Sequence, residues 1–122
     1  MLHILHGENA LQRQEALAAV VEASGVPADF RDMNTEVLEG SISSGELKSA
    51  CSVVPFLGEA RIVIAYDVLS KARKDVMEEI VSYLPELPET THLIFVEGKK
   101  LPKRHSAMAA ATKAKADIRH FE

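Results

Sequence analysis

The sequence has little cysteine, no long hydrophobic run and no excess of basic residues, and each absence excludes a class of protein. A single cysteine, Cys51, rules out an internal disulfide framework. No apolar run approaches the roughly 18 residues that a membrane-spanning helix needs. The N-terminal stretch MLHILHGENA lacks the basic and then apolar form of a secretion signal. We therefore expect a cytoplasmic protein that does not act on a membrane.

Net charge and chain length further narrow the kinds of protein that this sequence can encode. The 18 acidic residues outnumber the 14 basic ones, so the formal net charge is -4. This balance argues against electrostatic binding of nucleic acid by the domain as a whole, so any contact with DNA is expected to be indirect. With 122 residues, of which 47% are hydrophobic, the chain is predicted to form one domain, residues 1–122.

Short apolar runs alternate with helical patterns along the chain, around a polar stretch at Asn34–Ser44. The runs predict strands at Leu2–His6, Ala28–Met33, Arg61–Tyr66, His92–Glu97 and Ala116–Phe121. Apolar residues three and four apart predict helices at Asn9–Ser24, Ser43–Val54, Ser70–Leu84 and Pro102–Lys115. This alternation implies helices on both faces of a mostly parallel sheet, so we expect a three-layer α/β/α domain with about five strands.

The first strand-to-helix turn, His6-Gly7-Glu8-Asn9-Ala10, is where such a fold would bind a phosphate group. A P-loop needs several glycines and a lysine, but this turn has one glycine and places the carboxylate of Glu8 where phosphate would sit. The sequence thus predicts no nucleotide cofactor here. Asp67, which ends the Arg61–Tyr66 run, supports an alternative: Glu8 and Asp67 together resemble part of a phosphoacceptor receiver or of a nucleotide-binding domain.

Other reactive residues form no catalytic or metal-binding pattern. His3 and His6 would point to opposite faces of a strand, and the remaining histidines are scattered. Cys51 lies on an apolar helix face, which is typical of an inert buried thiol. A basic cluster, Lys99, Lys100, Lys103 and Arg104 with His105, is either a solvated surface or a contact for an acidic partner.

The segment Pro55-Phe56-Leu57-Gly58 is unusual because a turn usually places polar residues between a proline and a glycine. Two readings remain open from the residues alone. Phe56 and Leu57 either fold inward onto the core or project outward as an anchor for a partner.

Three longer segments carry a resemblance to a known family: LHILHGENALQRQEAL, VPFLGEARIVIAYDVL and YLPELPETTHLIFVEGKKL. In order and spacing they are similar to the N-terminal domain of the delta subunit of bacterial DNA polymerase III, a clamp-loader component. The resemblance covers essentially the whole chain. It implies a P-loop-NTPase-like, AAA+-like fold without a functional nucleotide site, a domain that is not itself an enzyme, and a parent protein with later domains that this chain lacks.

The resemblance also implies partners and a site. The partners would be the sliding clamp (the beta subunit of the polymerase) and, through the parent protein, the other clamp-loader subunits. The clamp-binding pair maps to Phe56 and Leu57, with Val54 and Pro55 beside it. Here Phe precedes Leu, which leaves open which side chain is the deeper anchor. Arg61 would either add a polar contact or be a strand-edge charge without a partner.

Overall fold

The computed structural model describes residues 1–57 and 59–122. Its centre is a parallel sheet in the order β2-β3-β4-β1-β5. The strands are β1 (Leu2–His6), β2 (Thr35–Glu39), β3 (Arg61–Tyr66), β4 (Thr91–Glu97) and β5 (Asp117–His120). The central strands β3, β4 and β1 are buried along nearly their whole length, as continuous apolar runs predict for strands covered on both faces.

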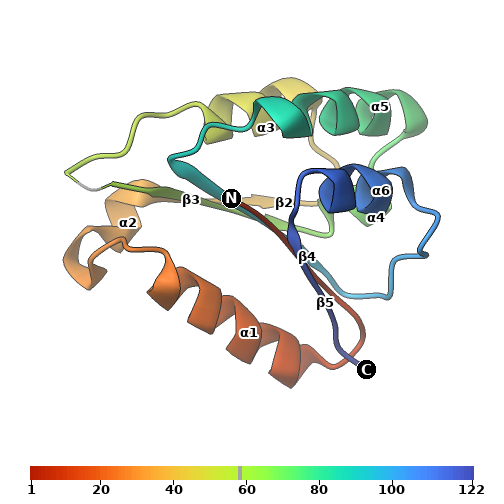
Figure 1. The fold of residues 1–122 in the computed structure, drawn as a ribbon, viewed down its shortest axis with the longest axis horizontal. Coiled ribbons are helices and arrows are strands. Elements are labelled where there is room, and N and C mark those ends of the chain that lie inside the picture. The colour runs from red at the N-terminus through yellow and green to blue at the C-terminus, as the bar shows by residue number, and fades with distance from the viewer. Residues whose placement is uncertain (58) are drawn as a thin grey trace.

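Helices cover both faces of this sheet, which confirms the predicted three-layer α/β/α class (Figure 1). On one face lie α1 (Ala10–Ala23), the turn η1 (Ala28–Phe30) and α2 (Arg31–Asn34). The other face carries α3 (Ser44–Cys51), α4 (Val68–Lys71), α5 (Lys74–Tyr83), η2 (Leu84–Glu86) and α6 (Ser106–Lys113). Each face of the sheet has its own hydrophobic core, so the sheet separates two packed layers of side chains.

The second strand was predicted at Ala28–Met33, and that prediction is wrong. This span folds into η1 and the start of α2, and the strand is β2, inside the Asn34–Ser44 stretch that the sequence analysis described only as polar. Phe30 and Met33 are three residues apart, which suits a helical turn better than a strand. The strand went unnoticed because β2 is an edge strand that buries little: even Val37 is 56% exposed.

Two helix boundaries also differ from the prediction. The expected helix Ser70–Leu84 is two helices, because the backbone becomes extended at Ala72 (ψ 135°) between α4 and α5. The last helix starts at Ser106 rather than Pro102. His105 is its N-cap, with Nδ1 accepting a hydrogen bond from the backbone N–H of Ala107 at 3.1 Å.

No helix in residues 1–57 and 59–122 combines the length and the apolar character needed to cross a bilayer.

Candidate docking site at the Phe56 turn

The segment 53–57, called here the Phe56 turn, connects α3 to β3 and extends from one end of the sheet beside α2 (Figure 1). Its apolar side chains face solvent: Val54 is 82% exposed, Leu57 68% and Phe56 49%. In the described structure these side chains are therefore not core residues. Gly58, which the sequence suggested would close the turn, lies outside the described residues.

A single buried side chain holds the backbone of Phe56. Asn34, at the end of α2, is fully buried. Its Oδ1 accepts a hydrogen bond from the Phe56 N–H at 2.6 Å, and its Nδ2 donates to the Phe56 carbonyl oxygen at 2.8 Å. Nδ2 also donates to the carbonyl oxygen of Phe30 at 3.0 Å. Because both polar backbone groups of Phe56 bond to one amide, the main chain is fixed while the ring projects outward.

Sequence reasoning missed Asn34, since it begins the stretch that was described only as polar. The sequence showed only a polar residue beside a predicted apolar run, and this does not indicate which residue the side chain contacts. Its partner is 22 positions away, so only the tertiary structure brings the two together.

Arg61 lies behind the turn rather than on its surface. Its side chain is buried; Nε donates to the Ala50 carbonyl oxygen at 2.8 Å, and Nη2 contacts Glu36 Oε1 on β2 at 2.9 Å. Beside it, Thr91 Oγ1 donates to the Cys51 carbonyl oxygen at 2.7 Å. These bonds satisfy carbonyl groups at the C-terminus of α3, which helix geometry leaves free. Arg61 thus links α3, β2 and β3 at the base of the turn.

Leu57 has a strained backbone. Its φ is 50°, in the left-handed region that costs a non-glycine residue about 1–2 kcal/mol. Its largely exposed side chain gains little burial in return. Burial within the domain therefore offsets little of this strain.

The turn at Gly7, where a P-loop protein would hold phosphate, is filled by the chain itself. The backbone N–H of Asn9 donates to the Phe121 carbonyl oxygen, and Gly7 N–H donates to Glu97. A Cβ added to Gly7 would lie 1.9 Å from the Phe121 oxygen, so the chain passes directly over this turn. Two of the turn's backbone donors are therefore used within the chain.

Glu8 and Asp67, the acidic pair of the alternative reading, have different surroundings. Glu8 is exposed, whereas Asp67 Oδ1 accepts a hydrogen bond from the Gly98 N–H at 2.8 Å. Within the part of the chain that the structure describes, no group of three His, Cys, Asp or Glu side chains could hold a metal ion. The geometry thus gives the phosphoacceptor reading no support.

The remaining reactive groups are structural. Cys51 is fully buried, and burial raises the pKa of its thiol to about 12, which leaves it protonated and unreactive. A hollow of about 960 Å³ between α5, η2 and α6 has a mainly apolar lining. Its charged lining groups are Glu89, Lys113 and the N-terminal amine of Met1, which form no catalytic arrangement.

Comparison with known proteins identifies the family. Residues 3–122 match the family described as DNA polymerase III, delta subunit. The chain belongs to the DNA polymerase III delta subunit family. This confirms the resemblance drawn from the three sequence segments. A search of curated protein sequences gives no match.

Solved structures agree with this delta-family assignment at the level of the fold. The Bacillus subtilis DNA clamp loader delta protein (YqeN) superimposes with a TM-score of 0.81 at 19% identity, over 98% of this chain and 38% of that one. A DNA polymerase III gamma subunit-related protein of Thermotoga maritima gives a TM-score of 0.65 at 18% identity, over 100% of this chain and 41% of that one. The delta-family chain studied here therefore spans about two fifths of the length of these proteins and shares the fold of that part.

Proposed function

We propose that this delta-family domain binds a sliding clamp through the Phe56 turn, as a non-catalytic, cytoplasmic part of a clamp loader. The observation that carries the proposal is that Phe56 and Leu57 project outward from a backbone that Asn34 fixes. Val54 and Pro55 extend the same surface. Contacts with other clamp-loader subunits would belong to the rest of the parent protein.

The energetics of such an anchor need more than two side chains. Burying a Phe and a Leu contributes about 1.5–3 kcal/mol each, whereas association costs on the order of 4–15 kcal/mol. The exposed side chains of Val53 and Val54 add apolar area beside them. Because the Phe56 backbone is already ordered, less entropy is lost on binding. Arg61 supports this arrangement from below, through α3 and β2, rather than by touching the clamp.

Clamp opening by such a domain requires no bond-breaking step. If the domain fits the opened ring better than the closed ring, binding alone shifts the ring toward the open form. The use of the Gly7 turn's backbone donors within the chain is consistent with nucleotide chemistry residing in other subunits.

The test is the double substitution Phe56→Ala with Leu57→Ala, with binding to purified clamp measured by surface plasmon resonance. We expect the affinity to fall about a hundredfold or more, because the apolar area of both anchors is lost. The melting temperature should fall much less than it does for a core substitution, since Leu57 is mostly exposed and Phe56 about half exposed.

Leu11→Ala is the matched control, because Leu11 is a similarly exposed leucine on α1, away from the turn. It should leave clamp affinity unchanged. Two results would count against the proposal: full clamp binding by the double variant, or a loss of binding that only follows a loss of folded protein.

A further inference from the structure

Half of the basic residues lie at one end of the sheet. Seven of the 14 Lys and Arg residues occupy the segments 71–74 and 99–104, which follow the carboxyl ends of β3 and β4. These seven exposed residues, called here the basic surface, are Lys71, Arg73, Lys74, Lys99, Lys100, Lys103 and Arg104. From 98 to 116 the sequence contains no Asp or Glu. An acidic protein thus presents one strongly basic end.

The chain itself does not neutralise this charge. Within the described ranges, Arg73 is the only one of the seven with an ion pair, to Asp75 at 3.7 Å, and both of those side chains are exposed. Two carboxylates at the ends of β3 and β4, by contrast, point inward. Asp67 accepts from the Gly98 N–H, and buried Glu97 accepts from the backbone N–H groups of Leu69 and Ser70. Clustered like charges repel, so a partner of opposite charge would stabilise this surface.

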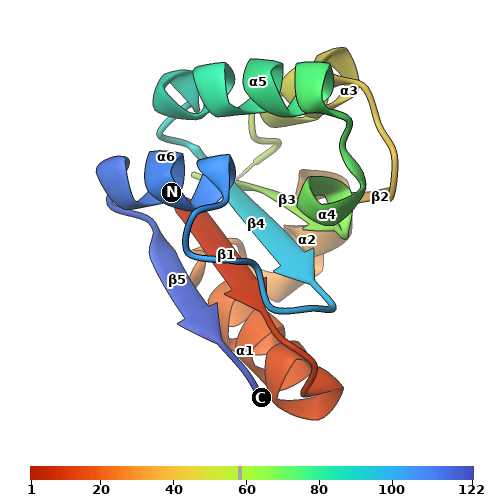
Figure 2. The same cartoon turned by 90° about the vertical axis from the view of Figure 1, so that its right-hand side faces the viewer.

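The loop that carries four of these cations is fixed from below. Leu101 is buried, and its N–H donates to His6 Nδ1 on β1 at 2.9 Å. The Gly98 N–H is held by Asp67, and the His105 N–H donates to the Pro102 carbonyl oxygen. Figure 2 shows this loop, in blue, crossing the end of β1 between β4 and α6. A partner therefore meets lysines on an ordered backbone, which lowers the entropy cost of binding.

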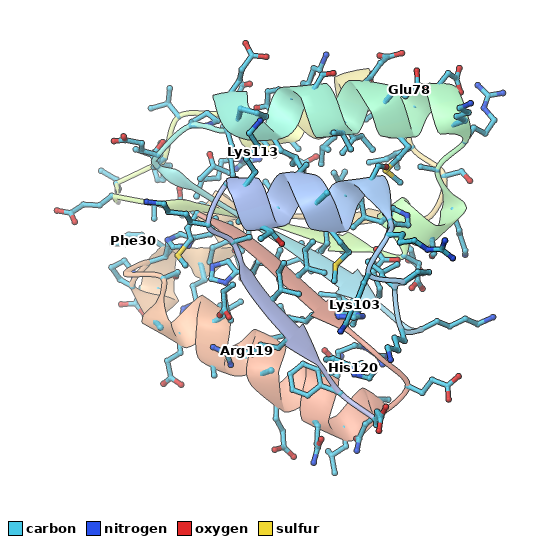
Figure 3. All side chains as sticks on the ribbon, turned by 45° about the vertical axis from the view of Figure 1, so that its right-hand side comes forward. Phe30, Glu78, Lys103, Lys113, Arg119 and His120 are labelled. Atoms are coloured by element: carbon cyan, nitrogen blue, oxygen red, sulfur yellow. The ribbon has the colours of Figure 1, made fainter. Side chains whose placement is uncertain are left out.

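A hollow of about 620 Å³ separates the two basic segments. Its floor is apolar, with Leu69, Met77 and Leu101, while Lys74, Lys99 and Lys100 line its rim. A complementary ligand must therefore offer both negative charge and an apolar side chain. Glu78 on α5 also lines the hollow (Figure 3). This carboxylate disfavours a chain of closely spaced phosphates, and the hollow's lining includes no Phe, Tyr or Trp ring on which a base would stack.

We propose that the basic surface binds an acidic, amphipathic peptide segment of a partner protein. The carboxylates of such a segment would meet the lysines, and one of its apolar side chains would enter the hollow. The surface lies at the carboxyl ends of the strands, whereas the Phe56 turn lies at the amino end of β3. Since the sheet is parallel, the two surfaces lie at opposite ends, and both can be occupied at once.

The experiment uses a fluorescein-labelled synthetic peptide of alternating Glu and Leu residues, with fluorescence anisotropy as the readout. The test variant is Lys99→Glu with Lys100→Glu, and the matched control is Lys113→Glu with Lys115→Glu, which makes the same change of charge. Figure 3 shows Lys113 at the end of α6 opposite the loop that carries Lys103. Circular dichroism verifies that both variants are folded.

We expect the test variant to bind the peptide at least about tenfold more weakly, and the control to stay within about twofold of the parent chain. A peptide with Gln in place of Glu should bind about tenfold more weakly as well, and added salt should weaken binding. Three results would overturn the proposal: no peptide binding by the parent chain, equal weakening in both variants, or displacement of the peptide by oligodeoxythymidine at lower concentration than by unlabelled peptide. Clamp binding should be unchanged in both variants, which separates this test from that of the Phe56 turn.

Discussion

Asn34 shows how one buried side chain can fix the backbone of an exposed turn. Its amide replaces the strand partner that Phe56 lacks, with one oxygen and one nitrogen serving the two backbone groups of that residue. An unsatisfied buried polar group costs about 1–3 kcal/mol, so Phe56 would not keep this position without the amide. The outward direction of the Phe56 ring is thus decided by a side chain on α2.

We predict that Asn34→Asp weakens clamp binding by more than its loss of stability explains. A carboxylate still accepts from the Phe56 N–H but no longer donates to the carbonyl oxygens of Phe56 and Phe30. The free energy of unfolding should fall by about 1–3 kcal/mol in urea titrations. Asn9→Asp, at the N-cap of α1, is the control and should be nearly neutral, because both residues cap helices well. Equal clamp affinity for parent and Asn34→Asp would remove the positioning role of Asn34.

At the scale of elements, two helix caps depend on residues only three apart in the sequence. Asn9 Oδ1 accepts a hydrogen bond from the Gln12 N–H at the start of α1. At the start of α3, Ser43 Oγ accepts from the Glu46 N–H while Glu46 Oε1 contacts the Ser43 N–H, which completes a capping box. Caps are local, so residues three apart determine them.

We predict that Ser43→Ala lowers the free energy of unfolding by about 1 kcal/mol, because it removes the N-cap acceptor of α3. Ser49→Ala changes an exposed serine in the middle of the same helix and should be neutral or slightly stabilising, since alanine favours helix. Thermal unfolding followed by circular dichroism measures both variants. A loss of stability in Ser49→Ala as large as that in Ser43→Ala would show that the cap is not the cause.

At the scale of the whole molecule, buried histidines make the stability of the fold depend on pH. His3 and His92 stack at 5.8 Å between ring centroids on neighbouring strands, and His3 Nδ1 lies 3.6 Å from Asp117 Oδ2 on β5. Burial lowers the pKa of His3, His6, His92 and His105 below the usual value of 6.5. The unfolded chain therefore takes up protons before the folded chain does, and stability falls as the pH drops through and below 6.5.

Glu97 acts in the opposite direction. Burial raises the pKa of its carboxyl from 4.5 to about 6, so the folded chain binds this proton more tightly. Its contribution to stability is present at low pH and is lost as the pH rises from about 4.5 to about 6. It therefore offsets part of the destabilisation by the histidines on acidification.

We predict that the melting temperature falls between about pH 7.5 and pH 5, the range in which histidines titrate. His3→Gln with His92→Gln should flatten this dependence, because it removes two groups that gain protons on unfolding. Glu97→Gln should steepen it, because the opposing group is gone. Differential scanning fluorimetry across the pH range measures all three slopes. Unchanged slopes in both variants would show that other groups control the pH dependence.

Local and periodic features were determined by the sequence itself. The caps, the four strands β1, β3, β4 and β5, and the alternation that implies a parallel three-layer fold all depend on residues close together in the chain or on its repeat of hydrophobicity. The three long segments that resemble the delta subunit likewise indicated the family from sequence alone. Strand β2 was not predicted, because an edge strand exposes most of its side chains and its apolar alternation is therefore weak.

Only the tertiary structure decided which way side chains point and which distant segments of the chain lie side by side. The sequence left two readings of Phe56 and Leu57 open, since a pair of apolar residues in a turn carries no information about which way it points. The contact between Asn34 and Phe56 spans 22 positions, and the basic surface joins segments 71–74 and 99–104 across two strand ends. Such contacts arise when distant segments pack side by side, and no local pattern encodes them.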